Sequence, residues 1–217
     1  MHVLRFAALL AALLAIACAG KHKRAELPPE ELYRQAQEAV ERKRYDRAQE
    51  LLDQLRDEYP FSRLAPEAEL LSADMAYQQK NYEEAAAAYR SFEELHPTNP
   101  RASYALYRRG LAYAALSLPE DRDQSGTRSA VAALERLLYA HPGSEYAEDA
   151  QRRLIELRGR LAGHELYVAR YYLRRKNYGA ALQRLETLVQ EYPDAPQRDE
   201  ALRLALELQA RTGTDSR

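Results

Sequence analysis

The side chains that most often carry nucleophilic or metal chemistry are few in this sequence: one cysteine and five histidines among 217 residues. A zinc site needs three or four such ligands within reach of one another. The histidines are instead scattered along the chain, at His2, His22, His96, His141 and His164. No HExxH, GxSxG, CxxC or phosphate-loop pattern accompanies them. We therefore expect no catalytic residue, no metal site and no cofactor.

Two of the histidines, His96 and His141, stand directly before a proline, in the place that Tyr59 and Tyr192 take elsewhere in the chain. This shared position predicts a structural role at a turn. The many Asp and Glu residues fall among Lys and Arg at helical spacing, which is the ordinary pattern of a solvated helix surface. Neither group points to an enzyme.

The single cysteine, Cys18, closes a segment typical of an export signal. Arg5 is followed by a twelve-residue apolar run, Phe6 to Ala17, which is shorter than the roughly 20 residues that span a bilayer. Residues 15–18, Ala-Ile-Ala-Cys, resemble a bacterial lipobox. We predict a lipoprotein signal peptide at 1–17, lipid attachment at Cys18 and a tether over 18–29; an ordinary signal peptide with an incidental cysteine is the alternative.

The residue after the cysteine, Ala19, bears on the destination of the chain. In the lipoproteins that this segment resembles, an aspartate there retains the protein at the inner membrane, so Ala19 indicates the periplasmic face of the outer membrane. The anchor makes the membrane one partner of the chain. The chain has 32 basic and 33 acidic residues and a formal net charge of -1, so it lacks the excess of basic residues typical of nucleic-acid-binding proteins, and we expect no nucleic-acid partner.

One spacing recurs four times along the chain. Counting from Tyr82, an apolar or small residue follows at offsets of 3, 7 and 10, and a proline follows at 15. The same offsets start from Tyr45, Tyr178 and Thr127. Offsets of 0, 3, 7 and 10 share one face of an α-helix, and the proline cannot continue it. Each copy therefore predicts an amphipathic helix with a defined end.

A second helix is expected before each copy, with a small residue at the crossing point: Ala36, Ala73, Gly110 and Ala169. These units resemble the tetratricopeptide repeat. The prediction is an all-α, tetratricopeptide-like helical-hairpin solenoid of about four and a half repeats over residues 30–211, followed by a disordered C-terminal tail at 212–217. An ordinary helical bundle is the alternative.

Two irregularities interrupt the array. The third hairpin contains an inserted polar loop between Leu116 and Arg128, which we expect to be solvated. The fourth begins with a nearly continuous helical stretch, Glu145 to Arg175, which Gly159 and Gly163 could divide in two. A last helical segment, Pro196 to Arg211, ends the array on a half repeat, and we expect it to pack on the fourth hairpin.

The first helices of the hairpins are expected to line a peptide-binding groove. By the repeat register its lining includes Tyr33, Leu70, Tyr77, Tyr104 and Tyr107. The sequence holds 16 tyrosines and no tryptophan, and tyrosine joins a large contact area to a polar end, which suits peptide recognition. The alternative for about half of the tyrosines is core packing, as at Tyr113 and Tyr172.

Several segments are similar to the YfiO family of outer-membrane assembly lipoproteins: Tyr59–Phe61, His96–Pro100, Leu106–Leu111, Asp121–Asp123, His141–Tyr146, Arg160–Ala162 and Val168–Tyr172. The resemblance implies a non-enzymatic subunit of the machinery that folds β-barrel proteins into the outer membrane. Its implied partners are the periplasmic domains of the central barrel protein, unfolded barrel precursors and other assembly lipoproteins. Arg184 matches an arginine of the family's docking surface. A periplasmic adaptor for peptidoglycan or pilus assembly is the competing interpretation.

Overall fold

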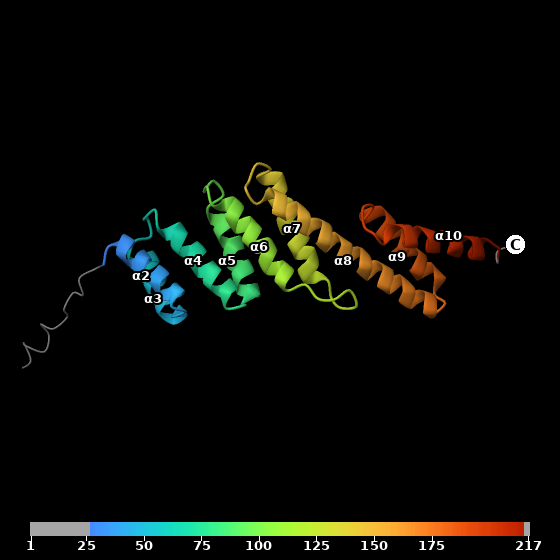
Figure 1. The fold of residues 1–217 in the computed structure, drawn as a ribbon, viewed down its shortest axis with the longest axis horizontal. Helices are drawn as coiled ribbons and strands as arrows, with labels where there is room; N and C mark the ends of the chain where they lie inside the picture. The colour runs from blue at the N-terminus through green and yellow to red at the C-terminus, as the bar shows by residue number, and fades with distance from the viewer. Residues whose placement is uncertain (1–26, 215–217) are drawn as a thin grey trace, which may run out of the picture.

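The computed structural model describes residues 27–214, with side chains over 27–210, as an elongated array of helical hairpins (Figure 1). The predicted signal peptide, Cys18, most of the tether and the last residues of the predicted tail lie outside the described residues. The helices are α2 (Pro29–Glu41), α3 (Tyr45–Glu58), α4 (Ala65–Gln78), α5 (Tyr82–Leu95), α6 (Ala102–Ala115), α7 (Ser125–Ala140), α8 (Ala147–Arg174), α9 (Tyr178–Glu191) and α10 (Arg198–Thr214). No strand occurs within 27–214, which confirms the all-α prediction.

The four recurring segments form the second helices of the hairpins, α3, α5, α7 and α9. Their predicted inward positions are buried, each at most 1% exposed: Ala48, Leu52, Leu55, Ala85, Tyr89, Phe92, Ala130, Leu134, Leu137, Ala181, Leu185 and Leu188. Burial of these apolar side chains is the main driving force that pairs the helices. The predicted amphipathic register is therefore confirmed.

The second helices of all four hairpins end with the same backbone geometry. Tyr59, His96, His141 and Tyr192 leave helical geometry with φ between -126° and -136°, and each is followed by proline. His96 also packs its ring against Phe92, with 4.9 Å between ring centroids, and bonds Glu69 at 3.0 Å. The structure thus gives His96 the structural role expected of it.

The turns inside three hairpins share a left-handed residue. Lys43, Lys80 and Lys176 have φ of 56°, 65° and 57°. In each turn the next residue donates its N–H back to a carbonyl five residues earlier, as Asn81 does to Ala76 at 2.9 Å. This is the Schellman arrangement, which satisfies carbonyls at a helix end and reverses the chain tightly.

Small side chains permit the helices to cross closely. Ala36, Ala73 and Ala169 are 0% exposed, and a Cβ at Gly110 would lie 2.5 Å from Leu134 Cδ2. Glycine at this point lets α6 and α7 approach each other. The predicted function of the four small residues is confirmed.

The long helix α8 runs without interruption through Gly159 and Gly163, so the interpretation that these glycines divide it is wrong. Its 28 residues span about 42 Å at 1.5 Å per residue. Leu154 and Leu157 pack in a core with α6 and α7, whereas Ala162 and Leu166 pack in a core with α9 and α10. Anchorage at both ends offsets the cost of about 1 kcal/mol that a glycine imposes on a helix interior.

The last helix, α10, continues to Thr214 rather than ending at Arg211. Ala201, Ala205 and Leu208 pack in the core that α9 shares, as expected for a half repeat. Leu202 and Leu206 remain 40% and 58% exposed. None of the helices between residues 27 and 214 is both long and apolar enough to cross a membrane.

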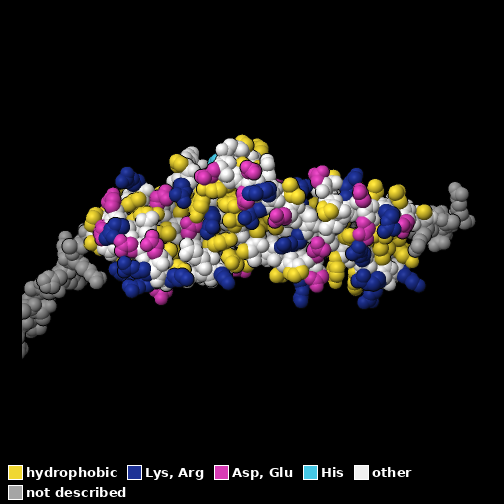
Figure 2. All heavy atoms as spheres, viewed as in Figure 1, with side chains coloured by type: hydrophobic (Ala, Val, Ile, Leu, Met, Phe, Trp, Pro, Cys, Tyr) yellow, Lys and Arg dark blue, Asp and Glu magenta, His cyan; other side chains and the backbone are white. Residues whose placement is uncertain are grey.

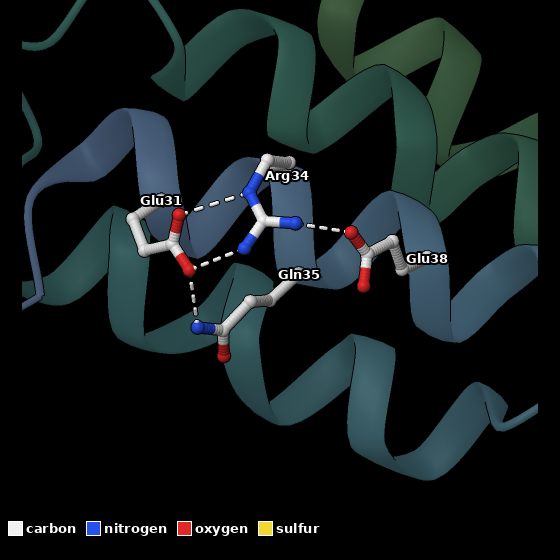
Figure 3. Close-up of polar contacts among 4 residues, drawn as sticks. All are labelled: Glu31, Arg34, Gln35 and Glu38. Atoms are coloured by element: carbon white, nitrogen blue, oxygen red, sulfur yellow. Dashed lines mark hydrogen bonds and ion pairs between the residues drawn. The ribbon is translucent and has the colours of Figure 1, made fainter.

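Surface charges of both signs alternate with hydrophobic side chains over the visible face (Figure 2). Figure 3 shows one such group on α2, where Arg34 lies between Glu31 and Glu38. Arg34 donates to Glu31 at 2.6 and 2.9 Å, and Gln35 donates to the same carboxylate at 2.7 Å. The hydrogen bond from Arg34, followed by that from Gln35, lowers the pKa of Glu31 to about 2.

Candidate functional site

The predicted groove residues lie on the first helices of the hairpins, and two of them, Tyr77 and Tyr104, gather around the pair formed by Asp74 and Arg108. Asp74, on α4, accepts hydrogen bonds from the hydroxyls of Tyr89 and Tyr104. Tyr104, on α6, lies 2.7 and 2.8 Å from the two carboxylate oxygens. Two separate helices, α5 and α6, are thereby tied to α4 through a single side chain.

Arg108 completes this arrangement from α6. Its Nε lies 3.3 Å from Asp74 and donates to the Tyr89 hydroxyl at 3.1 Å. Its guanidinium carbon lies 4.2 Å from the centre of the Tyr77 ring, a cation–π distance. Asp74 and Arg108 are each 20% exposed, so the pair is largely withdrawn from water.

A second group continues the surface toward α8. The rings of Tyr107 and Tyr146 stack at 4.9 Å with 13° between their planes. The Tyr107 hydroxyl donates to Asp149, which also accepts from Arg153. Tyr104 links the two groups, since its ring lies 5.9 Å from that of Tyr146. We call Tyr77, Tyr104, Tyr107 and Tyr146, with Asp74 and Arg108, the tyrosine face.

Tyr33, on α2, stands at the N-terminal edge of this face. Burial raises the pKa of its hydroxyl, and the charge of Glu67 adds to the effect while that of Arg101 opposes it. Arg101 in turn lies 4.5 Å over the Tyr104 ring. Arg101, which directly precedes α6, thus acts electrostatically on Tyr33 and lies over the ring of Tyr104.

Three of the side chains in these hydrogen bonds, Tyr89, Tyr104 and Asp149, have pKa values shifted away from their usual ones. Burial, and then the charge of Asp74, raises the pKa of Tyr89 and of Tyr104 well above its usual value near 10. The hydrogen bond from Tyr107, and then that from Arg153, lowers the pKa of Asp149. At neutral pH the phenols stay protonated and Asp149 stays ionised, so these groups hold a fixed arrangement rather than exchange protons.

Leu70 does not belong to this face, and its assignment to the groove lining was wrong. It is 1% exposed and packs in the core with Ala73, Ala85 and Phe92. The physical reason is that α4 is buried on two sides: Ala65, Ala68 and Met75 of the same helix pack in the core of the first hairpin. An apolar residue on such a helix contacts a neighbouring hairpin rather than solvent.

Sequence reasoning did not identify Asp74, Arg108, Tyr146, Asp149 or Arg153. A signal for two of them was present: Asp74 lies three residues before Tyr77, and Arg108 lies four residues after Tyr104. These spacings place a charge on the same helix face as a predicted groove tyrosine. Among the described residues, no group of three or more His, Cys, Asp or Glu is arranged to hold a metal ion.

Arg184, the predicted docking residue, lies on α9 with its side chain 43% exposed. Its Nη1 is 3.1 Å from Glu165 of α8, whose side chain is only 11% exposed. Arg184 therefore neutralises a largely buried carboxylate while part of its guanidinium faces solvent. It lies on the C-terminal hairpin, outside the tyrosine face.

Comparison with known proteins gives a family. The chain matches YfiO, described as an outer membrane lipoprotein, over residues 25–217. It is 34% identical over 194 residues to the outer membrane protein assembly factor BamD of Vibrio cholerae, covering 85% of this chain and 79% of that protein. Identity to BamD of Neisseria meningitidis serogroup A is 35% over 183 residues, covering 80% and 68% of the two chains.

Among solved structures, the TPR2AB domain of yeast Sti1 in complex with pHSP90 aligns with a TM-score of 0.48 and 13% identity, covering 82% of this chain and 71% of that one. A MamA double mutant aligns with a TM-score of 0.42 and 14% identity, covering 88% and 99%. The family match spans nearly all of the chain beyond its N-terminal segment. On the strength of that match, the chain belongs to the YfiO family of outer membrane lipoproteins.

Proposed function

We propose that this chain is an outer-membrane protein assembly factor and acts as a scaffold rather than as an enzyme. The observation that carries the proposal is the YfiO match over residues 25–217, supported by relatives at 34% and 35% identity that are named assembly factors. The tyrosine face supports a binding role, because its side chains are held by one another: Tyr104 donates to Asp74, and Arg108 Nε lies 3.3 Å from the same carboxylate.

The proposed ligand of the tyrosine face is an extended, aromatic-rich segment of an unfolded β-barrel precursor. The hydroxyls of Tyr89 and Tyr104 already donate hydrogen bonds to Asp74, so Tyr104 would contact a ligand through its ring rather than through its hydroxyl. Ring faces and guanidinium planes bind aromatic side chains and peptide groups through stacking and cation–π contacts. Because the receiving side chains are already ordered, binding costs little side-chain entropy.

The remaining parts of the proposal concern location and docking. Cys18 would carry the lipid that holds the chain at the periplasmic face of the outer membrane, with residues 18–29 as the tether. Arg184 would contact the periplasmic domains of the central barrel protein, and other assembly lipoproteins would share the complex. Several acyl groups on one cysteine suffice for stable anchoring, since each buried methylene contributes about 0.8 kcal/mol.

The tyrosine face can be tested with fluorescent peptides tiled across one outer-membrane β-barrel protein of the same organism. Aromatic-rich peptides should bind the full-length protein, and the double variant Tyr107→Ala, Tyr146→Ala should bind them about tenfold more weakly. The matched control is Tyr171→Ala, a change at a residue of α8 that lies outside the face and is 42% exposed. Equal affinity of the double variant and the wild type would remove the tyrosine face from the proposal.

A further inference from the structure

One side of α8 is open around Ile155 and Gly159, beside the first of the two cores that hold the helix. Ile155 is 73% exposed, an unusual state for a large aliphatic side chain in the middle of a helix. No atom lies within 4 Å of the position that a Cβ would take at Gly159, one turn further on. Both residues line surface hollows.

Two hollows meet at these residues. One of about 1010 Å³ lies between the inserted loop and the start of α10, and one of about 340 Å³ lies between α8 and the turn from α9 to α10. They share Ile155, Gly159 and Pro196, so they form one depression, which we call the α8 cleft. In Figure 1 the inserted loop and the α9–α10 turn are seen on opposite sides of α8. Apolar side chains dominate the lining: Leu118, Pro119, Ile155, Tyr167, Pro193 and Pro196.

The inserted loop is solvated as expected over residues 118–123, which are exposed, and hydrogen bonds hold its backbone in place. The buried amide of Gln124 donates to the carbonyls of Pro119 and Arg122 at 2.7 and 3.1 Å. His164 Nδ1 lies 2.6 Å from the Glu120 carbonyl. A Cβ at Gly163 would overlap the Glu120 carboxylate, so the Glu120 side chain lies directly against α8 at this glycine. The cleft thus has a preformed shape.

Polar atoms without partners lie on both walls of the cleft. Ser117 Oγ, in the inserted loop, and Gln197 Oε1, directly before α10, are buried and lack hydrogen-bond partners in the structure. Buried polar groups are normally paired, because an unmade hydrogen bond costs roughly 1–3 kcal/mol. An extended polypeptide presents alternating donors and acceptors, and small side-chain rotations would pair them with these two atoms.

The rim of the larger hollow carries an excess of negative charge. Glu120, Asp121 and Glu156 line it, against one basic residue, Arg160. An acidic rim disfavours anionic ligands such as nucleotides and favours lysine or arginine next to the bound segment. A hydrocarbon chain would fit the apolar floor but would leave Ser117 and Gln197 unpaired.

We propose that the α8 cleft binds an extended apolar polypeptide segment flanked by lysine or arginine, at a site separate from the tyrosine face. The apolar residues of that segment would pack on Ile155 and Pro196, and its basic residues would face Glu120, Asp121 and Glu156. The proposal does not depend on the proposed function, since it specifies only the chemistry of the partner.

The test uses the purified full-length protein in mild detergent and two fluorescent peptides, one alternating leucine with lysine and one alternating leucine with glutamate. The blocking variant is Gly159→Leu, which places a side chain in open space on the cleft floor. The matched control is Gly179→Leu, another helical glycine with nothing within 4 Å of the position a Cβ would take, but outside the cleft. Any partitioning of the peptides into micelles is the same for all three proteins.

The leucine–lysine peptide should bind the wild type and Gly179→Leu equally, and Gly159→Leu about tenfold more weakly. Because a leucine in α8 could alter folding, helicity is measured in parallel, and Glu156→Lys provides a second variant on an exposed rim position. Glu156→Lys should weaken binding of the lysine peptide and strengthen binding of the glutamate peptide.

Equal affinity of both peptides for the wild type would overturn the proposal, as would unchanged binding by Gly159→Leu. The remaining alternative is that a second copy of this chain occupies the cleft, and analytical ultracentrifugation tests it by measuring the oligomeric state. If the wild type self-associates and Gly159→Leu does not, the occupant of the cleft is a second copy of this chain, and the peptide assignment is wrong.

Discussion

Asp74 shows how one side chain can hold residues of several helices together. It holds the hydroxyls of Tyr89 and Tyr104 and lies 3.3 Å from Nε of Arg108, so residues of α4, α5 and α6 depend on its charge. Hydrogen bonds to a charged group are about twice as strong as neutral ones. These contacts therefore hold Tyr104 and Arg108 of the tyrosine face in place.

This arrangement predicts a loss of stability at high pH. The folded state raises the pKa of Tyr89 and Tyr104 above the unfolded value near 10, through burial first and the charge of Asp74 second. A raised folded pKa means that the stabilisation is full below pH 10 and is lost as pH rises further. Above pH 10 the free energy of unfolding should fall by about 1.4 kcal/mol per pH unit for each phenol that stays protonated in the folded state but ionises in the unfolded state.

Urea denaturation at a series of pH values between about 9 and 12 measures this slope. In the double variant Tyr89→Phe, Tyr104→Phe the slope should be shallower, although the stability at neutral pH will also be lower because Asp74 loses two donors. If wild type and variant lost stability with the same slope, the two phenols would not be the groups that titrate.

At the scale of helices, replacing glycine with alanine should destabilise the fold where the glycine is tightly packed and stabilise it where the glycine faces open space. A Cβ at Gly110 would lie 2.5 Å from Leu134, so Gly110→Ala should destabilise the fold by about 1–3 kcal/mol through overpacking. Gly159 has open space around that position, so Gly159→Ala should stabilise α8 by about 1 kcal/mol. Chemical denaturation of both variants measures the two effects. Changes of the same sign would contradict the packing described for α6 and α7.

The helices illustrate what the sequence could predict. The second helix of each hairpin buries a single face, so the spacing from Tyr82 to Phe92 was sufficient to predict both the helix and its buried side. The first helix of the second hairpin, α4, is buried on two sides, so an interpretation based on one apolar face placed Leu70 in a groove although it lies in a core. Glycine alone does not end a helix, and the continuity of α8 depends on long-range packing at both of its ends.

The sites were harder to predict for a related reason. Asp74 and Arg108 look like solvated charges in the sequence, because their partners are distant along the chain: the Tyr104 hydroxyl that bonds Asp74 is 30 residues away. The α8 cleft depends on the inserted loop folding against Gly163 and His164, which are more than 40 positions from that loop's own residue Glu120. Contacts of this range are not encoded in a local spacing.

At the scale of the whole molecule, the C-terminal hairpin is the proposed docking region. Arg184→Glu is a poor test, because it would set a second carboxylate beside the largely buried Glu165 and destabilise the hairpin. The double variant Arg184→Met, Glu165→Gln removes the exposed charge and the buried one together. We expect it to retain its helicity and to bind the barrel protein's periplasmic domains about tenfold more weakly.

The control for this experiment is Arg203→Met, on α10, where the arginine is 62% exposed and pairs with Glu207. Titration calorimetry with the isolated periplasmic domains measures the affinity, and circular dichroism measures helicity. Unchanged affinity of the double variant, with normal binding by Arg203→Met, would exclude Arg184 from the docking surface.

The central claim is that this chain is a scaffold for outer-membrane protein assembly. Identifying the proteins that bind it in the cell tests this claim most directly. The tagged full-length protein would be purified in mild detergent from the outer membrane of its own host, and co-purifying proteins would be identified by mass spectrometry. We predict recovery of a large barrel protein with repeated periplasmic domains in stoichiometric amount. Recovery of peptidoglycan-linked or pilus proteins in its place would contradict the claim and leave only the fold.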